Sequence, residues 1–161
     1  MAKRGTQEDE LDRARKKAMR LLRVKLRSTT ELRERLSAAG FRIHEVEAVV
    51  GELQKAKVLD DAALAEAEVR RLKERGAVGA KAVRARLRKR GLDAGATGDV
   101  AGSNRAEVAT FAANRLAAMP PKLSVAAKAR RLFGLLARRG IDEDLAGNVV
   151  AKLTGVTRDE A

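Results

Sequence analysis

The chain has 161 residues and no cysteine, which excludes disulfides, thiolate metal sites and a cysteine nucleophile. Its formal net charge is +13, which favours an anionic partner: nucleic acid first, an acidic protein surface second, an anionic membrane third. Apolar residues make up 45% but aromatic residues only 2%, so we expect helices packed through Ala, Leu and Val rather than a large β-sandwich.

The sequence also argues against a membrane protein. No segment approaches the roughly 20 apolar residues of a membrane span. Residues 1–12 are mostly polar and lack the apolar core of a signal peptide. These features predict a soluble, cytoplasmic protein without a membrane partner.

The N-terminal third predicts three helices. Residues 1–9 are polar, and we expect them to be frayed and flexible; an amphipathic helix follows over about 10–26, with Leu26 in its apolar stripe. Ser28 and Glu31 have the spacing of a capping box, which predicts a short helix ending at Gly40. A third helix over 43–56 would turn Ile43 and the valines that follow it inward. Residues 10–57 are thus predicted to form a first three-helix unit.

Two further units are predicted, over residues 58–102 and 103–153, with a tail at 154–161. In the second, an aspartate at 60 or 61 caps a helix that reaches about Glu74 and has Ala62 in its apolar stripe. Glycines then separate it from a helix over 80–90. Only a weak third helix is expected within 93–102, because this segment is glycine-rich. In the third unit, Ser103 or Asn104, then Ser124, then Asp142 would cap three helices.

A repeat underlies these units. The second helix of each is predicted to end at a glycine, and these three glycines lie 51 and 49 residues apart: Gly40, Gly91 and Gly140. A valine follows each glycine nine residues later: Val49, Val100 and Val149. The pattern predicts an all-α protein, a tandem array of three three-helix units that is elongated and curved.

Candidate catalytic residues are few. There is no Gly-Lys-Ser phosphate-binding loop, and His44 is the only histidine, more typical of a surface side chain than of a general base or metal site. Asp60 and Asp61 fit helix capping better than metal binding. We therefore predict a protein that is not an enzyme and that uses no cofactor or metal.

The charge distribution is more informative. Ten Lys and Arg residues lie between Arg70 and Arg90, with Glu74 as the only acid. Within the predicted helix over 80–90, the cations fall opposite Val83 and Leu87, as a solvated face or a binding face would, and we favour binding. The contact candidates on this and the neighbouring helices are Arg70, Arg71, Lys81, Arg84, Arg88, Lys89, Lys128 and Arg131.

Four motifs in register resemble the RecX family, the regulatory proteins of the RecA recombinase. They are Arg27-Ser28-x-x-Glu31-Leu32-x-x-x-Leu36-x-x-x-Gly40-Phe41, then Val58-Leu59-Asp60-Asp61-x-x-Leu64-Ala65, then Gly79-x-x-x-Val83-x-x-x-Leu87-x-x-Arg90-Gly91-Leu92, and finally Leu135-Leu136-x-x-Arg139-Gly140-Ile141-x-x-Asp144. The chain departs from the family pattern at Leu64, where Phe is frequent, and at Arg86, where Glu is usual.

The resemblance implies a non-enzymatic modulator of homologous recombination, DNA repair and the SOS response. Such proteins bind the RecA–DNA filament along its groove and restrain ATP hydrolysis, strand exchange and co-protease activity. We expect a monomer whose basic faces meet the RecA filament, single- or double-stranded DNA, or both. Short second and third helices are also typical of helix-turn-helix modules, so a stand-alone basic DNA-binding module is the alternative.

Overall fold

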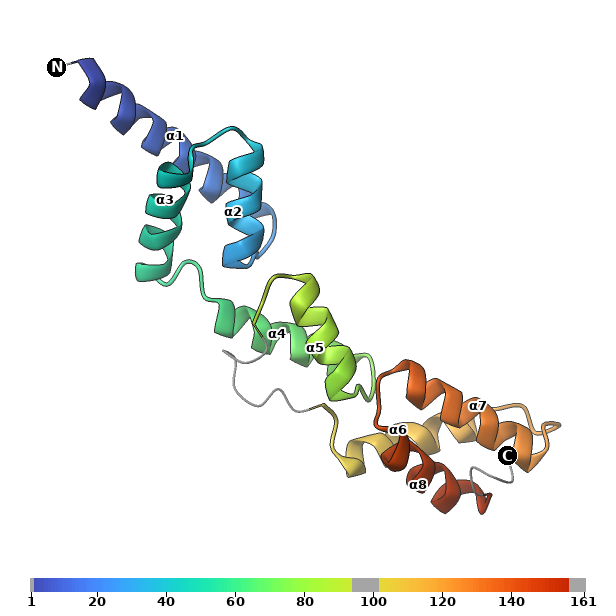
Figure 1. Cartoon of the computed structure of the whole chain (residues 1–161). Coiled ribbons are helices and arrows are strands. Elements are labelled where there is room, and N and C mark those ends of the chain that lie inside the picture. The colour runs from blue at the N-terminus through green and yellow to red at the C-terminus, as the bar shows by residue number, and fades with distance from the viewer. Residues whose placement is uncertain (1, 94–101, 157–161) are drawn as a thin grey trace. The chain divides into compact units, whose positions relative to one another are not determined.

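The computed structural model describes residues 2–93 and 102–156, and these residues form eight α-helices and no β-strand (Figure 1). They divide into two compact units. Within the described residues, unit 1 comprises Met1–Ala67 with Leu87–Thr97, and unit 2 comprises Glu68–Arg86 with Gly98–Ala161. The prediction of an all-α protein is confirmed.

Unit 1 is built on a three-helix bundle of α1 (Ala2–Val24), α2 (Thr29–Ala38) and α3 (Ile43–Lys55). Each helix turns one face toward the other two, and the side chains on these faces form a core of small and branched residues. The predicted packing through Ala, Leu and Val is therefore observed. The buried members are Ala14, Ala18, Leu32, Leu36, Val46, Val49, Val50, Leu53 and Leu59.

The predicted capping interactions of α2 are present. The Ser28 hydroxyl accepts a hydrogen bond from the Glu31 N–H at 3.0 Å, and the Glu31 carboxylate accepts one from the Ser28 N–H at 3.1 Å, which completes the capping box. At the other end Gly40 has a φ of 90°, and Phe41 returns to pack against the core. The helix therefore begins and ends where its capping residues dictate.

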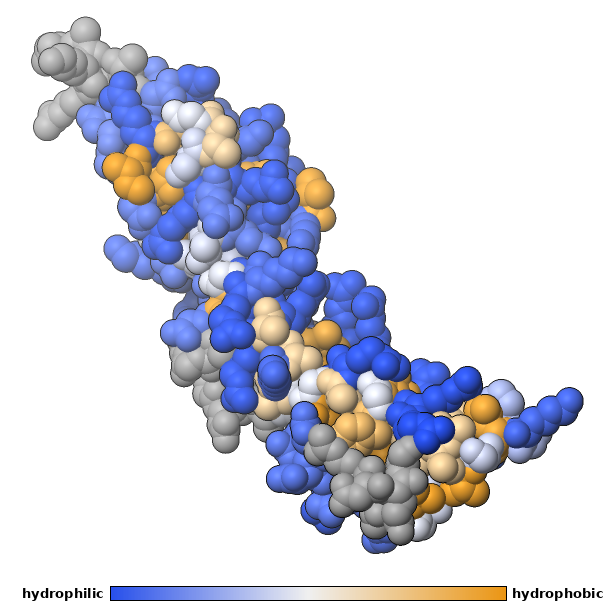
Figure 2. Space-filling model, turned by 45° about the vertical axis from the view of Figure 1, so that its right-hand side comes forward, coloured by the Kyte–Doolittle hydropathy of each residue, from blue (hydrophilic) through white to orange (hydrophobic). Residues whose placement is uncertain are grey.

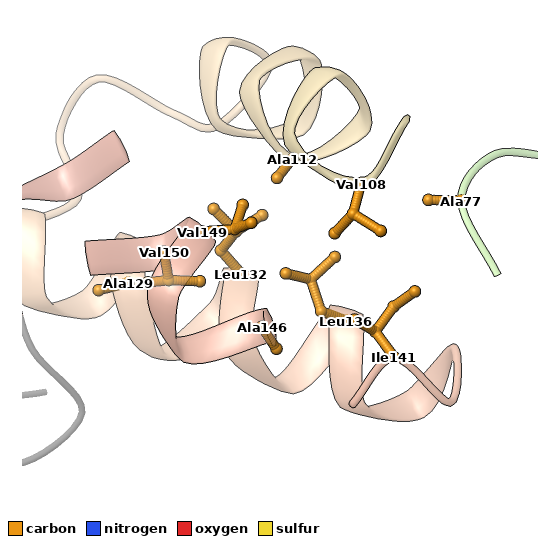
Figure 3. Packing of buried hydrophobic residues seen from close by; sticks show 10 residues of the cluster. All are labelled: Ala77, Val108, Ala112, Ala129, Leu132, Leu136, Ile141, Ala146, Val149 and Val150. Atoms are coloured by element: carbon orange, nitrogen blue, oxygen red, sulfur yellow. The ribbon is translucent and has the colours of Figure 1, made fainter. Parts of the chain in front are cut away.

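Unit 2 contains a second bundle, of α6 (Arg105–Ala117), α7 (Val125–Arg138) and α8 (Glu143–Thr154). Figure 3 shows its core, where Val108 and Ala112 of α6 meet residues of α7 and α8. The predicted caps are present: Asn104 accepts from the Glu107 N–H, Ser124 from the Ala127 N–H, and Asp142 from two backbone N–H groups of α8. The remaining two helices are α4 (Asp61–Glu74) and α5 (Ala80–Lys89).

The structure corrects the predicted start of the first helix. Helix α1 begins at Ala2, whereas the apolar spacing predicted a start near residue 10; the flexibility of residues 1–9 stays a prediction. The reason is that residues such as Lys3, Gln7 and Glu8 are polar but are strong helix formers, so hydropathy alone marks them as irregular.

Three residues assigned to apolar stripes face the solvent. Ile43 is 70% exposed and Leu26 is 66% exposed, and Ala62 is also exposed. Ile43 is the first residue of α3 and Leu26 follows the end of α1, so neither has the helical neighbours that would turn it toward the core. On α4 the buried residues are Leu64, Ala65 and Glu68.

Two predictions are not addressed by these residues. The weak helix expected within 93–102, and with it Val100, lies for the most part outside the described residues. The boundaries of three separate units at residues 57 and 102 stay a prediction. What the structure establishes is one three-helix bundle at each end of the chain, with α4 and α5 between them in sequence.

Candidate partner-binding surfaces

Helix α5 carries a row of cations on its exposed side, and hydrophilic residues cover most of the face of the molecule that Figure 2 shows. Val83 and Leu87 are fully buried at the four-residue spacing of one helix face. The exposed side holds four of the contact candidates: Lys81, Arg84, Arg88 and Lys89. The predicted orientation of this helix is confirmed, while its role in binding stays a prediction.

The other contact candidates lie on different helices. Arg70 and Arg71 are exposed on α4, Arg131 is exposed on α7, and Lys128 of α7 is half-buried. Among the described residues none of the eight candidates forms an ion pair. Their charges are therefore uncompensated within the part of the chain that the structure describes.

Of the residues considered for catalysis or metal binding, Asp60 and Asp61 accept hydrogen bonds from backbone N–H groups. His44 is half exposed, and its ring lies 3.8 Å from the Glu45 carboxylate. Asp60 caps α4 by accepting from the Ala63 N–H at 3.0 Å, and Asp61 accepts from the Thr29 N–H at 2.8 Å. The described residues contain no group of three or more potential metal ligands, and none of their helices is long and apolar enough to cross a membrane.

Arg90, the last cation of the run from Arg70, is buried instead of being presented to a partner. It is 6% exposed, and its guanidinium donates to the Glu31 carboxylate at 2.9 and 3.2 Å and to the Leu26 carbonyl at 2.7 Å. Its own carbonyl accepts from the Ser28 hydroxyl at 2.5 Å. Arg90 thus fixes the C-terminal end of α5 to the start of α2, inside unit 1.

The contacts with Arg90 and Ser28 change the pKa of the Glu31 carboxyl group. Burial acts to raise the pKa of Glu31, but hydrogen bonds from the Arg90 guanidinium and the Ser28 N–H together outweigh it, so the pKa lies below its ordinary value. The carboxylate is consequently ionised at neutral pH, where it compensates the buried guanidinium.

Arg139 makes the equivalent contacts inside unit 2. Its guanidinium donates to the Ala77 carbonyl at 2.5 Å and to the Arg75 carbonyl at 2.8 Å, and its own carbonyl accepts from the Gly79 N–H at 2.9 Å. It also lies over the ring of Phe111, 4.8 Å from the centroid. Desolvation, and to a lesser degree the nearby Arg115, lower the pKa of Arg139.

These two sets of contacts follow one scheme, which we call the Arg–Gly joint. In each, an arginine stands directly before a glycine that ends a helix. Ser28 and Gly79 are the residues just before α2 and α5, and the arginine donates to the carbonyl two residues before them: Arg90 to Leu26, and Arg139 to Ala77. The arginine's own carbonyl accepts a hydrogen bond from Ser28 or Gly79 itself. The glycines, Gly91 and Gly140, have φ values of 63° and 68°. The sequence repeat is therefore also a repeat of contacts.

Sequence reasoning missed these joints. Arg90 was counted within the basic run from Arg70, and Arg86 of that run is also occupied, by the buried Glu68 at 3.2 Å. One signal was available, because Arg-Gly recurs at the end of the second helix in the second and third predicted units, whereas Ala39 precedes Gly40 in the first. A glycine alone suffices to end a helix, so a recurring arginine before it indicates a further contact.

Comparison with known proteins supports one family. Residues 14–53, which form most of the first bundle, match the model for the first three-helix domain of RecX. The chain is 32% identical over 149 residues to the regulatory protein RecX of Mycolicibacterium vanbaalenii, covering 86% of this chain and 81% of that protein. It is 29% identical over 147 residues to the regulatory protein RecX of Amycolatopsis mediterranei, covering 89% and 84%.

Solved structures agree in fold. The crystal structure of RecX from Lactobacillus salivarius matches with a TM-score of 0.73 at 19% identity, covering 92% of this chain and 99% of that one. A second crystal structure, of a regulatory protein RecX, matches with a TM-score of 0.72 at 17% identity, covering 93% and 75%. With a relative above 30% identity that is matched over most of its length, the chain belongs to the RecX family.

Proposed function

We propose that this protein binds RecA–DNA filaments and inhibits RecA, restraining ATP hydrolysis, strand exchange and the co-protease activity that triggers the SOS response. It acts as a monomeric cytoplasmic regulator without catalysis of its own, and so modulates recombination and DNA repair. Membership of the RecX family, whose relatives are named regulatory proteins, supports the regulatory role.

The observation that carries the proposal is the α5 row. Lys81, Arg84 and Arg88 project from one helix, separated by three and four residues, with no ion pair to a described residue. Cations kept close together without an acid repel one another, and an anionic partner removes that cost. An acidic RecA surface or the DNA of the filament supplies the anion.

The test is inhibition of DNA-dependent ATP hydrolysis by RecA. We expect the variant Lys81→Glu/Arg84→Glu/Arg88→Glu to need at least about tenfold more protein for half-inhibition, because three attractive contacts become repulsive, each worth up to about 1 kcal/mol at an exposed site. A matched control reverses three exposed lysines elsewhere with the same change in net charge: Lys55, Lys122 and Lys152.

The two variants decide between specific contact and bulk charge. Equal loss in both would mean that net charge, not the α5 row, drives binding. Wild-type protein that binds bare DNA tightly but leaves RecA ATP hydrolysis unchanged would refute RecA inhibition and favour the alternative, a stand-alone basic DNA-binding module.

A further inference from the structure

Helix α1 and the residues directly after it carry a basic segment that the contact candidates do not include. Between Arg13 and Ser28 there are eight Lys and Arg residues and no acid. The run from Arg70 to Arg90 is longer and includes Glu74, and two of its arginines are occupied inside the protein. The exposed side of α1 therefore has to be considered separately.

Three of the cations of α1 lie on the side of the helix that faces away from the bundle. Ala14 and Ala18 of α1 are fully buried against α2 and α3. Lys16, Arg20 and Arg23 follow one another at four- and three-residue steps on the opposite side and are exposed. An open groove of about 530 Å³ lies along them, lined by Arg15, Lys16, Met19, Arg20 and Arg23.

Nothing in the described residues neutralises this row. Arg15, at the edge of the groove, is bound by Glu52 at 2.9 Å and also pairs with Asp12. Lys16, Arg20 and Arg23 form no ion pair with a described residue. Like charges at these spacings destabilise a helix by about 0.2–0.5 kcal/mol per pair. The row is thus a set of donors held ready without an internal acceptor.

The hydrogen-bonding groups of the groove indicate which class of partner it can bind. Ammonium and guanidinium groups donate hydrogen bonds and accept none, so the groups that face them must be acceptors. A phosphodiester backbone offers only acceptors, whereas an acidic protein surface presents donors as well. Helix α1 has no aromatic residue on which bases could stack, as single-strand binding commonly requires.

The spacing also fits a phosphate backbone. At about 1.5 Å rise per residue, the row from Lys16 to Arg23 is about 10.5 Å long. One strand of a DNA duplex carries a phosphate about every 3.4 Å along its axis, so the row spans about three phosphates. We propose that the outer face of α1, formed by Lys16, Arg20 and Arg23, is a second interaction surface that binds the phosphate backbone of double-stranded DNA without reading its sequence.

The experiment measures binding of the full-length chain to a labelled 25-base-pair duplex by fluorescence anisotropy across a salt series. The variant is Lys16→Gln/Arg20→Gln/Arg23→Gln, since glutamine keeps helix propensity and removes charge. Each lost phosphate contact lowers the slope of log K against log salt by about 0.9. We expect the slope to fall by about 2.7 in this variant and to stay near that of wild type in a control with Lys55, Lys122 and Lys152 changed to Gln.

Three results would overturn the proposal. The α1 variant and the control could show the same slope, which would reduce DNA binding to net charge. The α1 variant could keep its duplex slope but lose binding to polyglutamate, which would assign the face to an acidic protein. It could also lose single-strand binding while keeping duplex binding. Far-UV circular dichroism of both variants checks that the helices are retained, and RecA inhibition measured in parallel separates this surface from the proposed function.

Discussion

The ion pair between Arg90 and Glu31 allows a quantitative test of the Arg–Gly joint. In Glu31→Gln the amide oxygen still accepts from the Ser28 N–H, so the capping box is preserved while the negative charge is lost. Two charge-assisted hydrogen bonds to Arg90 are affected, each worth about 1.5–3 kcal/mol, and the amide oxygen can retain one of them as a weaker bond.

The expected cost of Glu31→Gln is therefore about 2–3 kcal/mol. Arg90→Met is expected to cost less, about 1–2 kcal/mol, because it removes the buried charge itself and leaves a carboxylate whose side chain is 22% exposed and still capped by Ser28. In the double variant the two losses overlap, so the total should fall short of the sum by about 1 kcal/mol.

Urea unfolding of the four proteins at pH 7, followed by far-UV circular dichroism, measures these differences. Arg33→Met is a suitable comparison, because the Arg33 and Glu47 side chains form an exposed ion pair at 2.8 Å, and such pairs contribute about 0–1 kcal/mol. Equal costs for Glu31→Gln and Arg90→Met that add without overlap would refute the interpretation of a coupled, buried pair.

Two further predictions concern the joints. The pKa of Glu31 is lowered in the folded state, so its contribution is present above the unfolded pKa and is lost as the pH falls through the folded pKa; the stability gap between wild type and Glu31→Gln should narrow below about pH 4.5, which acid titration of both proteins in urea can show. In unit 2, a Cβ on Gly79 would lie 1.6 Å from the Gly140 carbonyl oxygen, so Gly79→Ala should lower the free energy of unfolding by at least about 2 kcal/mol. Gly147→Ala in α8, where a Cβ meets nothing within 4 Å, should instead be neutral or stabilising by up to about 1 kcal/mol; a harmless Gly79→Ala would contradict the close approach.

Interactions could be predicted from the sequence when the two residues lie close together along the chain. Caps such as Ser28, Asn104 and Ser124 were predicted because donor and acceptor lie three residues apart. The core stripe of α3 was likewise visible at helical spacing. Ile43 was misassigned because periodicity does not mark the end of a helix, where the turn that would cover a side chain is missing.

The candidate site was harder to predict, because exposure depends on remote partners. The row on α5 was found from its alternation with Val83 and Leu87. Arg90 continues the same run of charges, yet its acceptors at Glu31 and Leu26 are 59 and 64 residues away in the chain. A local pattern cannot separate a cation that serves a partner from one that joins two helices, and only the contacts in the folded chain do so.

The Arg–Gly joint also means that the residue before Gly40, Gly91 or Gly140 indicates whether the end of that helix packs against an earlier helix. Arginine occupies that position at 90 and 139, where the helix end is docked, and there the glycine is crowded by Thr30 or Ala82. Alanine occupies it at 39, where a Cβ on Gly40 would meet nothing within 4 Å. Among the described helices none takes, relative to α2, the position that α2 takes relative to α5, so an arginine at 39 would find no acceptor of this kind among the described residues. One residue type thus marks each repeat as either the first of the series or a successor.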